Sequence, residues 1–284
     1  MARNCRSAFV IGLDGAIGGS VREAATPNID EILSEGIVDY SAQTVFPSSS
    51  FEAWGAMFHG VGPEKHKLNG DRPCPEDVPW PSFMKVAKQS LPEVKCASFS
   101  CWEPINTHII EGSCDCHSVS MPDPVLTAAA AAYIRAYSPD IYFMQLDAID
   151  AVGHSHGYGS QEYLEQITAT DALVGVVIDA IRDAGIFDES LIVLLSDHGG
   201  DGKSHGSDHP DCMTIFWGCC GPGIASGIEL ENQVNIMDTA AVVAYALGLP
   251  APERWDAREW VSGGVSEWGS EAASECGRED MKEM

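Results

Sequence analysis

The sequence has few basic residues. It contains 16 Lys and Arg against 42 Asp and Glu, which gives a formal net charge of −26 over 284 residues. Proteins that hold a nucleic-acid backbone do so with a Lys- and Arg-rich surface that displaces counterions, so we expect no nucleic-acid backbone binding. The acidity fits either a solubility margin or a salt-rich habitat. An anionic substrate would need a local source of positive charge, such as bound cations.

Long apolar runs are also missing. No segment approaches the ~20 apolar residues that a membrane-spanning helix needs, so we expect no membrane partner. The N-terminus, Met1–Arg6, leads into a strand pattern without the separate apolar region of a secretory signal. The sequence therefore predicts a cytoplasmic protein with reduced thiols. It carries no signal for an oligomeric state.

The ten cysteines do not show the paired spacing of a zinc ribbon. The segment Cys114–His117, with Cys96 and Cys101 upstream, is an alternative metal-binding pattern. Free cysteines are common in protein cores, and we favour that interpretation.

Strand and helix patterns alternate along the chain. This alternation predicts an α/β fold, a three-layer α/β/α sandwich with a mainly parallel central sheet. We expect a single domain over 1–284, with 70–123 as an insertion or cap-like region and 267–284 as an acidic tail. The segment 70–123 contains a strand-like piece at 95–99, so a less regular part of the layers is the alternative. The predicted strands cover 8–13, 37–45, 140–147, 190–196 and 213–218, and the predicted helices cover 27–35, 51–60, 124–137, 160–184 and 236–247.

Carboxylates and imidazoles lie at the ends of the predicted strands or in Gly-rich loops beside them. Open α/β sheets bind ligands at the carboxyl ends of their strands. Taken singly, such residues are usually caps or exposed loop positions, but together at one edge they indicate a metal site. Mixed carboxylate and imidazole ligands suit zinc, manganese or iron better than calcium. The candidates are Asp14, Asp150, His154, Asp197, His198 and His205.

A serine run precedes the helix predicted at 51–60, which places Ser50 at or near its N-cap. A helix N-terminus offers free N–H groups and a positive dipole end to a phosphoryl group. Ser50 is therefore a candidate nucleophile, although a simple N-cap is the alternative. Ser48 and Ser49 are further candidates.

Six short motifs occur in a fixed order over about residues 8–250: Gly12-Leu13-Asp14-Gly15, Thr26-Pro27-Asn28-Ile29, Phe46-Pro47-Ser48-Ser49-Ser50-Phe51, Asp150-x-x-Gly153-His154, Ser196-Asp197-His198-Gly199 and Ser204-His205-Gly206. In order and spacing they resemble the alkaline phosphatase superfamily. Within it, the chain is most similar to the branch of type I phosphodiesterases and nucleotide pyrophosphatases.

The resemblance implies an alkaline phosphatase-like catalytic domain with two divalent metal ions, Zn²⁺ first, with Mn²⁺ or Fe as alternatives. It implies that Ser50 attacks phosphorus to give a phosphoseryl intermediate, while one ion activates its hydroxyl and the other stabilises the leaving oxygen. The implied ligands are Asp14, Asp197 and His198, bridged by Ser50, for one ion, and Asp150, His154 and His205 for the other.

The implied function is hydrolysis of small phosphate esters, preferably at phosphodiester or nucleotide pyrophosphate bonds. Members of this branch usually carry Thr as nucleophile and an Asn three residues later, where this chain has Ser50 and Ala53. Ala53 cannot donate a hydrogen bond to the phosphoryl oxygens, which supports a non-catalytic metal-binding interaction protein as one alternative. A phosphomonoesterase or phosphomutase of the same superfamily is another. A sulfatase is disfavoured because no x-Pro-x-Arg sequence follows Ser50.

Other side chains near the motifs have alternative roles. Lys203 is a candidate replacement for the missing Asn, or a simply exposed lysine. Phe51 and Trp54 could form an aromatic wall for a nucleobase, although such positions are more often core. His156 and His209 are alternative ligands to His205.

Overall fold

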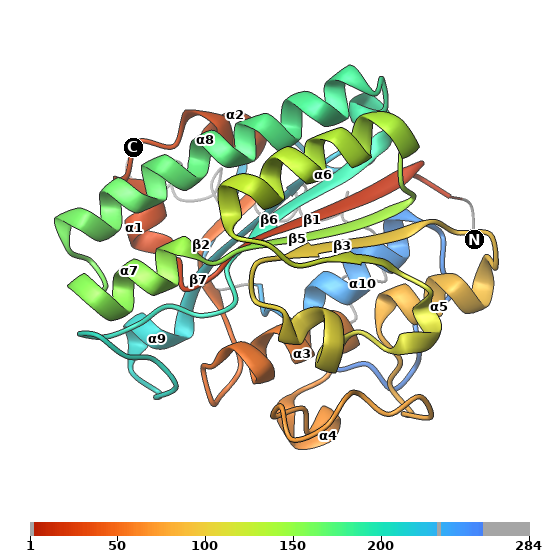
Figure 1. Ribbon diagram of the computed structural model, residues 1–284, viewed down its shortest axis with the longest axis horizontal. Helices are drawn as coiled ribbons and strands as arrows, with labels where there is room; N and C mark the ends of the chain where they lie inside the picture. The colour runs from red at the N-terminus through yellow and green to blue at the C-terminus, as the bar shows by residue number, and fades with distance from the viewer. Residues whose placement is uncertain (1–2, 232–233, 258–284) are drawn as a thin grey trace, which may run out of the picture.

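The computed structural model describes residues 3–231 and 234–257. Its centre is an eight-stranded sheet with the strand order β4-β3-β5-β1-β6-β7-β2-β8 (Figure 1). β7 runs antiparallel to both of its neighbours, and the other pairs are parallel. The strands are β1 Ser7–Leu13, β2 Ile37–Gln43, β3 Cys96–Ser100, β4 His117–Val119, β5 Ile141–Leu146, β6 Ser190–Leu195, β7 Thr214–Cys220 and β8 Ile228–Leu230.

Helices cover both faces of the sheet, so the predicted three-layer α/β/α fold is confirmed (Figure 1). One face carries α2, α6 and α8, and the other carries α3, α5 and α10. The helices are α1 Gly18–Glu23, α2 Pro27–Ser34, α3 Ser50–His59, α4 Pro63–His66, α5 Phe83–Ser90, α6 Asp123–Tyr137, α7 Ala148–His156, α8 Gln161–Asp183, α9 Pro210–Met213 and α10 Asp238–Ala246, with short turns η1 Ile105–Ile109, η2 Gly112–Cys114 and η3 Phe187–Glu189.

The three central strands are buried on both faces. In β1, Ala8 and Val10 join the core beneath α3 and α10, while Phe9 and Ile11 join the core beneath α6 and α8. A strand buried on both faces has a nearly continuous apolar sequence, which is why the sequence predicts β1, β5 and β6. These strands pair in parallel and end level with one another, so the residues that follow them emerge side by side.

The segment 70–123, expected as an insertion or cap-like region, supplies elements of the main layers. β3 pairs in parallel with β5 and β4 extends the sheet beyond it, while α5 covers one face. Ser and Cys alternate with Ala and Phe in β3, which obscures the apolar run of a buried strand. The expected acidic tail at 267–284 lies outside the described residues.

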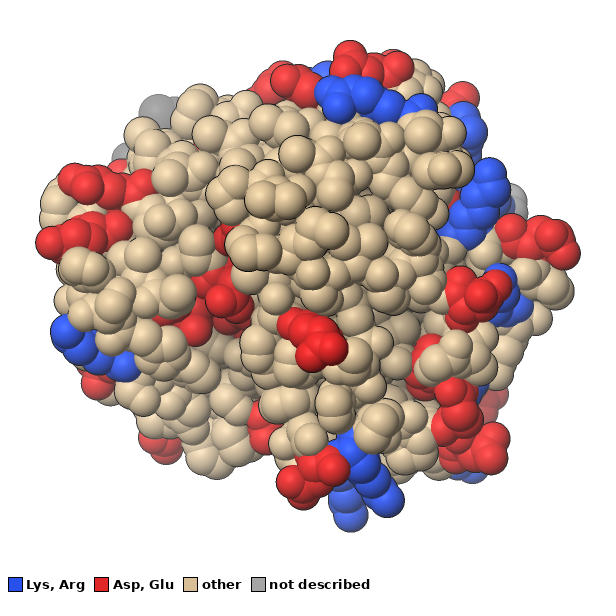
Figure 2. Space-filling model, viewed as in Figure 1, with Lys and Arg blue, Asp and Glu red and all other residues tan. Residues whose placement is uncertain are grey.

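The acidic composition is visible on the surface. On the face shown in Figure 2, acidic and basic side chains surround a broad expanse that carries neither, and one group of acidic side chains lies beside α7. None of the described helices is long and apolar enough to cross a membrane. The nine cysteines within the described ranges are free thiols.

Gly12 allows α3 to pack closely on β1. A Cβ at this position would lie 2.2 Å from Cη2 of the fully buried Trp54, whereas a Cβ on Gly19 in α1 would meet nothing within 4 Å. We predict that Gly12→Ala lowers the free energy of unfolding by about 1–3 kcal/mol through overpacking. Gly19→Ala should leave it unchanged or raise it by up to about 1 kcal/mol. Urea denaturation measures both, and equal midpoints for the two variants would contradict the packing argument.

Candidate metal centre and nucleophile

Two carboxylates and an imidazole meet where β1 and β6 end. Asp14 follows β1 directly, and Asp197 and His198 follow β6 after one residue. All three side chains are buried, and each offers a ligand atom within 4.8 Å of the others. Nε2 of His198 lies 3.6 Å from Oδ1 of Asp14 and 3.3 Å from Oδ2 of Asp197.

Each carboxylate is fixed through one oxygen only. Oδ2 of Asp14 accepts hydrogen bonds from Gln145 Nε2 at 2.9 Å and Trp54 Nε1 at 3.2 Å. Oδ1 of Asp197 accepts from the backbone N–H groups of Gly15 at 3.0 Å and His198 at 2.9 Å. The other oxygens, Asp14 Oδ1 and Asp197 Oδ2, are buried and have no hydrogen-bond donor among the described residues. Such atoms are rare in folded proteins, and a divalent cation between them would satisfy both, so these residues fit a metal.

The ring of His198 has the orientation of a metal ligand. Its Nδ1 lies 2.9 Å from the carbonyl oxygen of Gly199, which can accept the Nδ1 proton and leave Nε2 with a lone pair. Burial lowers the pKa of His198, which favours the neutral ring. The free nitrogen faces the carboxylates and the hydroxyl of Ser50.

Ser50 is the serine of its run that reaches this centre. Its Oγ lies 3.2 Å from Nε2 of His198. Ser49 is the N-cap residue of α3 and donates its hydroxyl to Glu52, while Ser48 donates to the carbonyl of Ser207 at 2.6 Å. Ser50 is thus the first residue of α3 and not its cap, and the geometry favours it over the two alternatives.

A second group lies against the first. Asp150, His198 and His205 place ligand atoms within 4.8 Å of one another. Oδ2 of Asp150, on α7, lies 3.3 Å from Nε2 of His154, and Oδ1 lies 4.0 Å from Nε2 of His205. Nδ1 of His154 lies 2.9 Å from the carbonyl of Lys203, so Nε2 is left free to bind. The structure therefore brings all seven predicted site residues together, and their roles as ligands stay a prediction.

The His205 ring lies between the other two imidazoles. Its centroid is 3.9 Å from that of His198 and 5.0 Å from that of His154. Burial and the neighbouring His198 lower the pKa of His205. The lowered pKa values of His198 and His205 favour their neutral rings, which is also the form that binds metal.

Several supporting residues were not predicted. Gln145 and Trp54 orient Asp14, and the Tyr158 hydroxyl donates to Oδ1 of Asp150. The Tyr163 hydroxyl donates to the carbonyl of Gly15 at 2.6 Å. Gln145 is a polar residue within an apolar strand, a signal that could have identified it. Trp54 and Tyr163 make contacts remote in sequence, which no local pattern indicates, and Tyr158 lies eight residues after Asp150 without a motif that links the two.

The positions of Lys203 and Ala53 limit which groups could donate hydrogen bonds to the phosphoryl oxygens. Lys203 donates its ammonium to the carbonyl of Ser155 at 2.6 Å, so it does not replace the missing Asn. Ala53 lies in α3 and is fully buried in the hydrophobic core. The remaining donors beside Ser50 are the backbone N–H groups of the first turn of α3.

The suggested nucleobase wall is wrong for Trp54. This side chain is fully buried and its N–H is bound to Asp14. Phe51 packs edge to face against Trp102, with 4.6 Å between centroids. His156 and His209 lie near Glu162 and Asp211 respectively, and neither belongs to a ligand group among the described residues.

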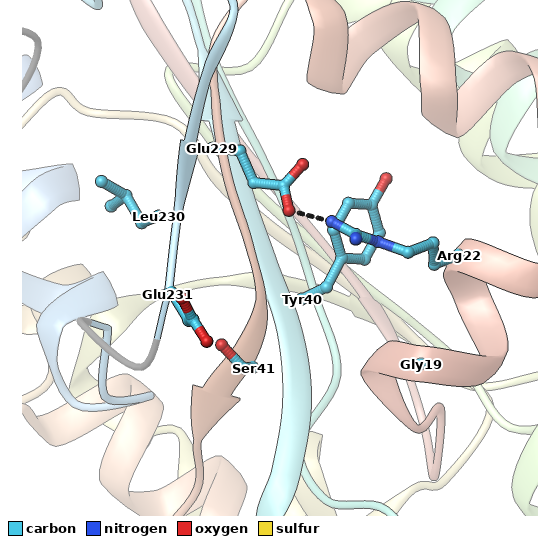
Figure 3. A pocket seen from close by; sticks show the side chains of 7 residues that line it. All are labelled: Gly19, Arg22, Tyr40, Ser41, Glu229, Leu230 and Glu231. Carbon is cyan, nitrogen blue, oxygen red and sulfur yellow. Dashed lines mark hydrogen bonds and ion pairs between the residues drawn. The ribbon is translucent and has the colours of Figure 1, made fainter. Parts of the chain in front are cut away.

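A cavity of about 530 Å³ lies apart from this centre, beside α1, β2 and β8 (Figure 3). Its basic residue, Arg22, forms an ion pair with Glu229 and lies over the ring of Tyr40. No residue of its lining belongs to the ligand groups described above.

The fold and the clustered ligands define an α/β protein with a candidate metal centre at the carboxyl edge of its sheet. Residues 8–213 match the family described as type I phosphodiesterase / nucleotide pyrophosphatase, and the chain belongs to this family. The predicted resemblance is confirmed.

Two curated relatives illustrate the range of the family. GPI ethanolamine phosphate transferase 1 of Emericella nidulans is 30% identical over 136 residues, which cover 40% of this chain and 15% of the relative. Ectonucleotide pyrophosphatase/phosphodiesterase family member 1 of Mus musculus is 38% identical over 61 residues, which cover 22% of this chain and 7% of the relative. The matched regions thus span only a small part of the length of these relatives.

Solved structures share the fold. Murine ectonucleotide pyrophosphatase/phosphodiesterase 5, described as an inactive variant in complex with AMP, aligns with a TM-score of 0.76 and 14% identity over 92% of this chain and 99% of that chain. A 2-O GAG sulfatase aligns with a TM-score of 0.71 and 14% identity over 92% of this chain and 75% of that chain. These likenesses support the alkaline phosphatase-like architecture.

The unpaired carboxylates predict a pH-dependent stability of the metal-free protein. Burial raises the pKa of Asp197 from its ordinary 3.8 to about 7, and burial together with the Asp197 charge raises the pKa of Asp14 well above its ordinary value. The folded state therefore binds more protons than the unfolded state in this range, so stability falls as pH rises from about 4 to about 7.

Asp197→Asn keeps an acceptor for the two N–H groups and removes the charge. With metal removed by chelator at pH 8, the free energy of unfolding of this variant should exceed that of the wild type by up to about 4 kcal/mol. The difference should vanish below about pH 4. Added Zn²⁺ should stabilise the wild type more than the variant. Urea denaturation across pH measures this, and a variant less stable than wild type at pH 8 in chelator would contradict it.

Proposed function

We propose that this protein hydrolyses phosphodiester or nucleotide pyrophosphate bonds in small substrates, with Ser50 as the nucleophile and two divalent metal ions, Zn²⁺ first. The observation that carries the proposal is the position of the Ser50 hydroxyl, 3.2 Å from Nε2 of His198. This imidazole belongs to both ligand groups, so the hydroxyl lies where they meet.

The proposed ligand sets are those that the resemblance implies. When bound, two divalent ions would lower the pKa of a hydroxyl and stabilise charge on the phosphoryl and leaving oxygens. The buried oxygens of Asp14 and Asp197 that lack donors support the first set. Asp14, Asp197, His198 and Ser50 would hold one ion, and Asp150, His154 and His205 the other.

Ser50 performs the covalent step in this proposal. Its Oγ forms a bond to phosphorus as the bond from phosphorus to the leaving oxygen breaks, which gives a phosphoseryl intermediate. Water then displaces the Ser50 oxygen from phosphorus and the hydroxyl is restored. The first turn of α3 has N–H groups without intrahelical acceptors. These groups would bind the phosphoryl oxygens in place of the side chain missing at Ala53.

A second candidate is transfer to an alcohol. It is favoured by the similarity to the GPI ethanolamine phosphate transferases, of which one is 30% identical over 136 residues. The covalent step would be the same, and an acceptor hydroxyl would take the place of water. Release of a phosphodiester or phosphomonoester of an added alcohol, detected by mass spectrometry, would identify this reaction.

We predict that the metal-loaded protein cleaves bis-p-nitrophenyl phosphate faster than p-nitrophenyl phosphate. The family supports diester or pyrophosphate substrates, and chelator should abolish both activities because the carboxylates would then repel the anion. A monoester preference would instead favour the phosphomonoesterase or phosphomutase alternative. No turnover of either substrate, with two metals bound, would favour the non-catalytic alternative.

The role of Ser50 predicts a sharp difference between neighbouring serines. At saturating metal, Ser50→Ala should lower kcat by about a thousandfold or more, because no other hydroxyl of the run faces His198. Ser50→Thr should keep most of the activity. Ser49→Ala is the matched control and should lose only the modest stability of its Glu52 contact. Acid-quenched samples should carry on Ser50 the phosphoryl group of the substrate with its remaining ester group, and full activity of Ser50→Ala would overturn the assignment.

A further inference from the structure

A second kind of ligand cluster lies at the far end of α3. We propose that His59, Cys74 and Glu111 bind a zinc-class divalent ion that serves a structural role. Each offers a ligand atom within 4.8 Å of the others, and all three are buried. Ser50 begins the same helix that His59 ends, roughly 14 Å away along its axis. The cluster is therefore distinct from the candidate metal centre, and the proposal does not depend on the proposed function.

Both ring nitrogens of His59 lie close to backbone carbonyl oxygens, and Nε2 also lies near the sulfur of Cys74. Nδ1 lies 2.9 Å from the carbonyl oxygen of Trp80, and Nε2 lies 3.1 Å from the carbonyl oxygen of Ile109. A neutral imidazole has a single N–H, so one nitrogen must present its lone pair to a carbonyl oxygen. If Nδ1 donates to Trp80 at the shorter distance, the lone pair of Nε2 is directed toward Cys74, whose sulfur is 3.8 Å away. This is the arrangement in which a histidine binds metal through one nitrogen and donates the other to a backbone carbonyl.

Glu111 is a buried carboxylate held in place by the start of α5. Its Oε1 accepts from the backbone N–H of Ser82 at 3.0 Å, and its Oε2 accepts from the Ser82 hydroxyl at 2.5 Å. No Lys or Arg forms an ion pair with it within the described part of the chain, and the nearby Lys85 is paired with Glu76. A buried carboxylate is costly without a compensating charge.

The donor set selects the ion. Sulfur, imidazole nitrogen and carboxylate oxygen together suit zinc, while calcium and magnesium take oxygen ligands. A divalent ion with one thiolate, one carboxylate and a neutral imidazole forms an electroneutral group, and binding releases the thiol proton of Cys74. Cys114, fully buried, donates its thiol proton to Oε2 of Glu111 at 3.7 Å and is not counted among the ligands.

The cluster would fasten an irregular part of the chain. Residues 67–82, between α4 and α5, contain no helix or strand. An ion bound to Cys74 would tie this segment to α3 and to the loop before η2. The pattern Cys114–His117, considered from the sequence, does not form the site, because His117 stacks on Tyr133 with 4.4 Å between centroids.

Cobalt substitution tests this site separately from the candidate metal centre. The full chain is stripped of metal with chelator and titrated with Co²⁺ while the near-ultraviolet absorbance is recorded. Only a thiolate ligand gives a sulfur-to-cobalt charge-transfer band, and the seven residues of the candidate metal centre include no cysteine. We expect this band with one equivalent of Co²⁺ and its displacement by Zn²⁺.

Variants assign the band. Cys74→Ser should abolish it and lower the bound metal by one equivalent, while Asp14→Asn should keep it. Cys5→Ser, which removes a buried thiol elsewhere, is the matched control. If Cys74→Ser does not fold, Glu111→Gln is the second variant, because it keeps the thiol. Its affinity for Co²⁺, measured by titrating the band, should be at least tenfold lower than that of the wild type. Absence of the band in the wild type, or its persistence in Cys74→Ser, would overturn the proposal.

Discussion

The repulsion between buried carboxylates is the constraint on which the candidate metal centre depends. Asp14 and Asp197 each use one oxygen for hydrogen bonds that hold the side chain still, and each leaves another oxygen without a donor among the described residues. Without a cation the protein must either keep these groups protonated or accept a large loss of stability. The centre is therefore preorganised to bind cations. Bound cations would also supply the local positive charge that an anionic substrate needs on so acidic a protein.

The packing of α3 on the sheet places Ser50, the proposed nucleophile, relative to these carboxylates. Trp54 lies against Gly12 on one side of this contact and donates its N–H to Asp14 on the other. One side chain thus links the helix that begins with Ser50 to the strand that ends before Asp14. Because the contact is close and buried, the distance between hydroxyl and ligands is set by core packing and not by a flexible loop.

The sequence is most informative where one physical cause dominates. Strands buried on both faces are usually apolar nearly throughout, so β1, β5 and β6 are predictable, and so are the polar residues that follow them. β3 gives a weaker pattern, predicted only as a strand-like piece at 95–99, because its small polar residues interrupt the apolar run. The support given to Asp14 by Trp54, and the meeting of His59, Cys74 and Glu111, depend on contacts between segments far apart in sequence. No spacing rule relates them, and only the tertiary fold brings them together.

His198 belongs to both ligand groups of the candidate metal centre but has a single nitrogen free to bind. If two ions bind, that nitrogen serves one of them, and the other must draw on His154, whose side chain is 43% exposed. The two positions would then differ in lability. One ion, held by fully buried groups, would exchange slowly and persist through purification. The other, open to solvent on one side, would follow the free metal concentration around the protein.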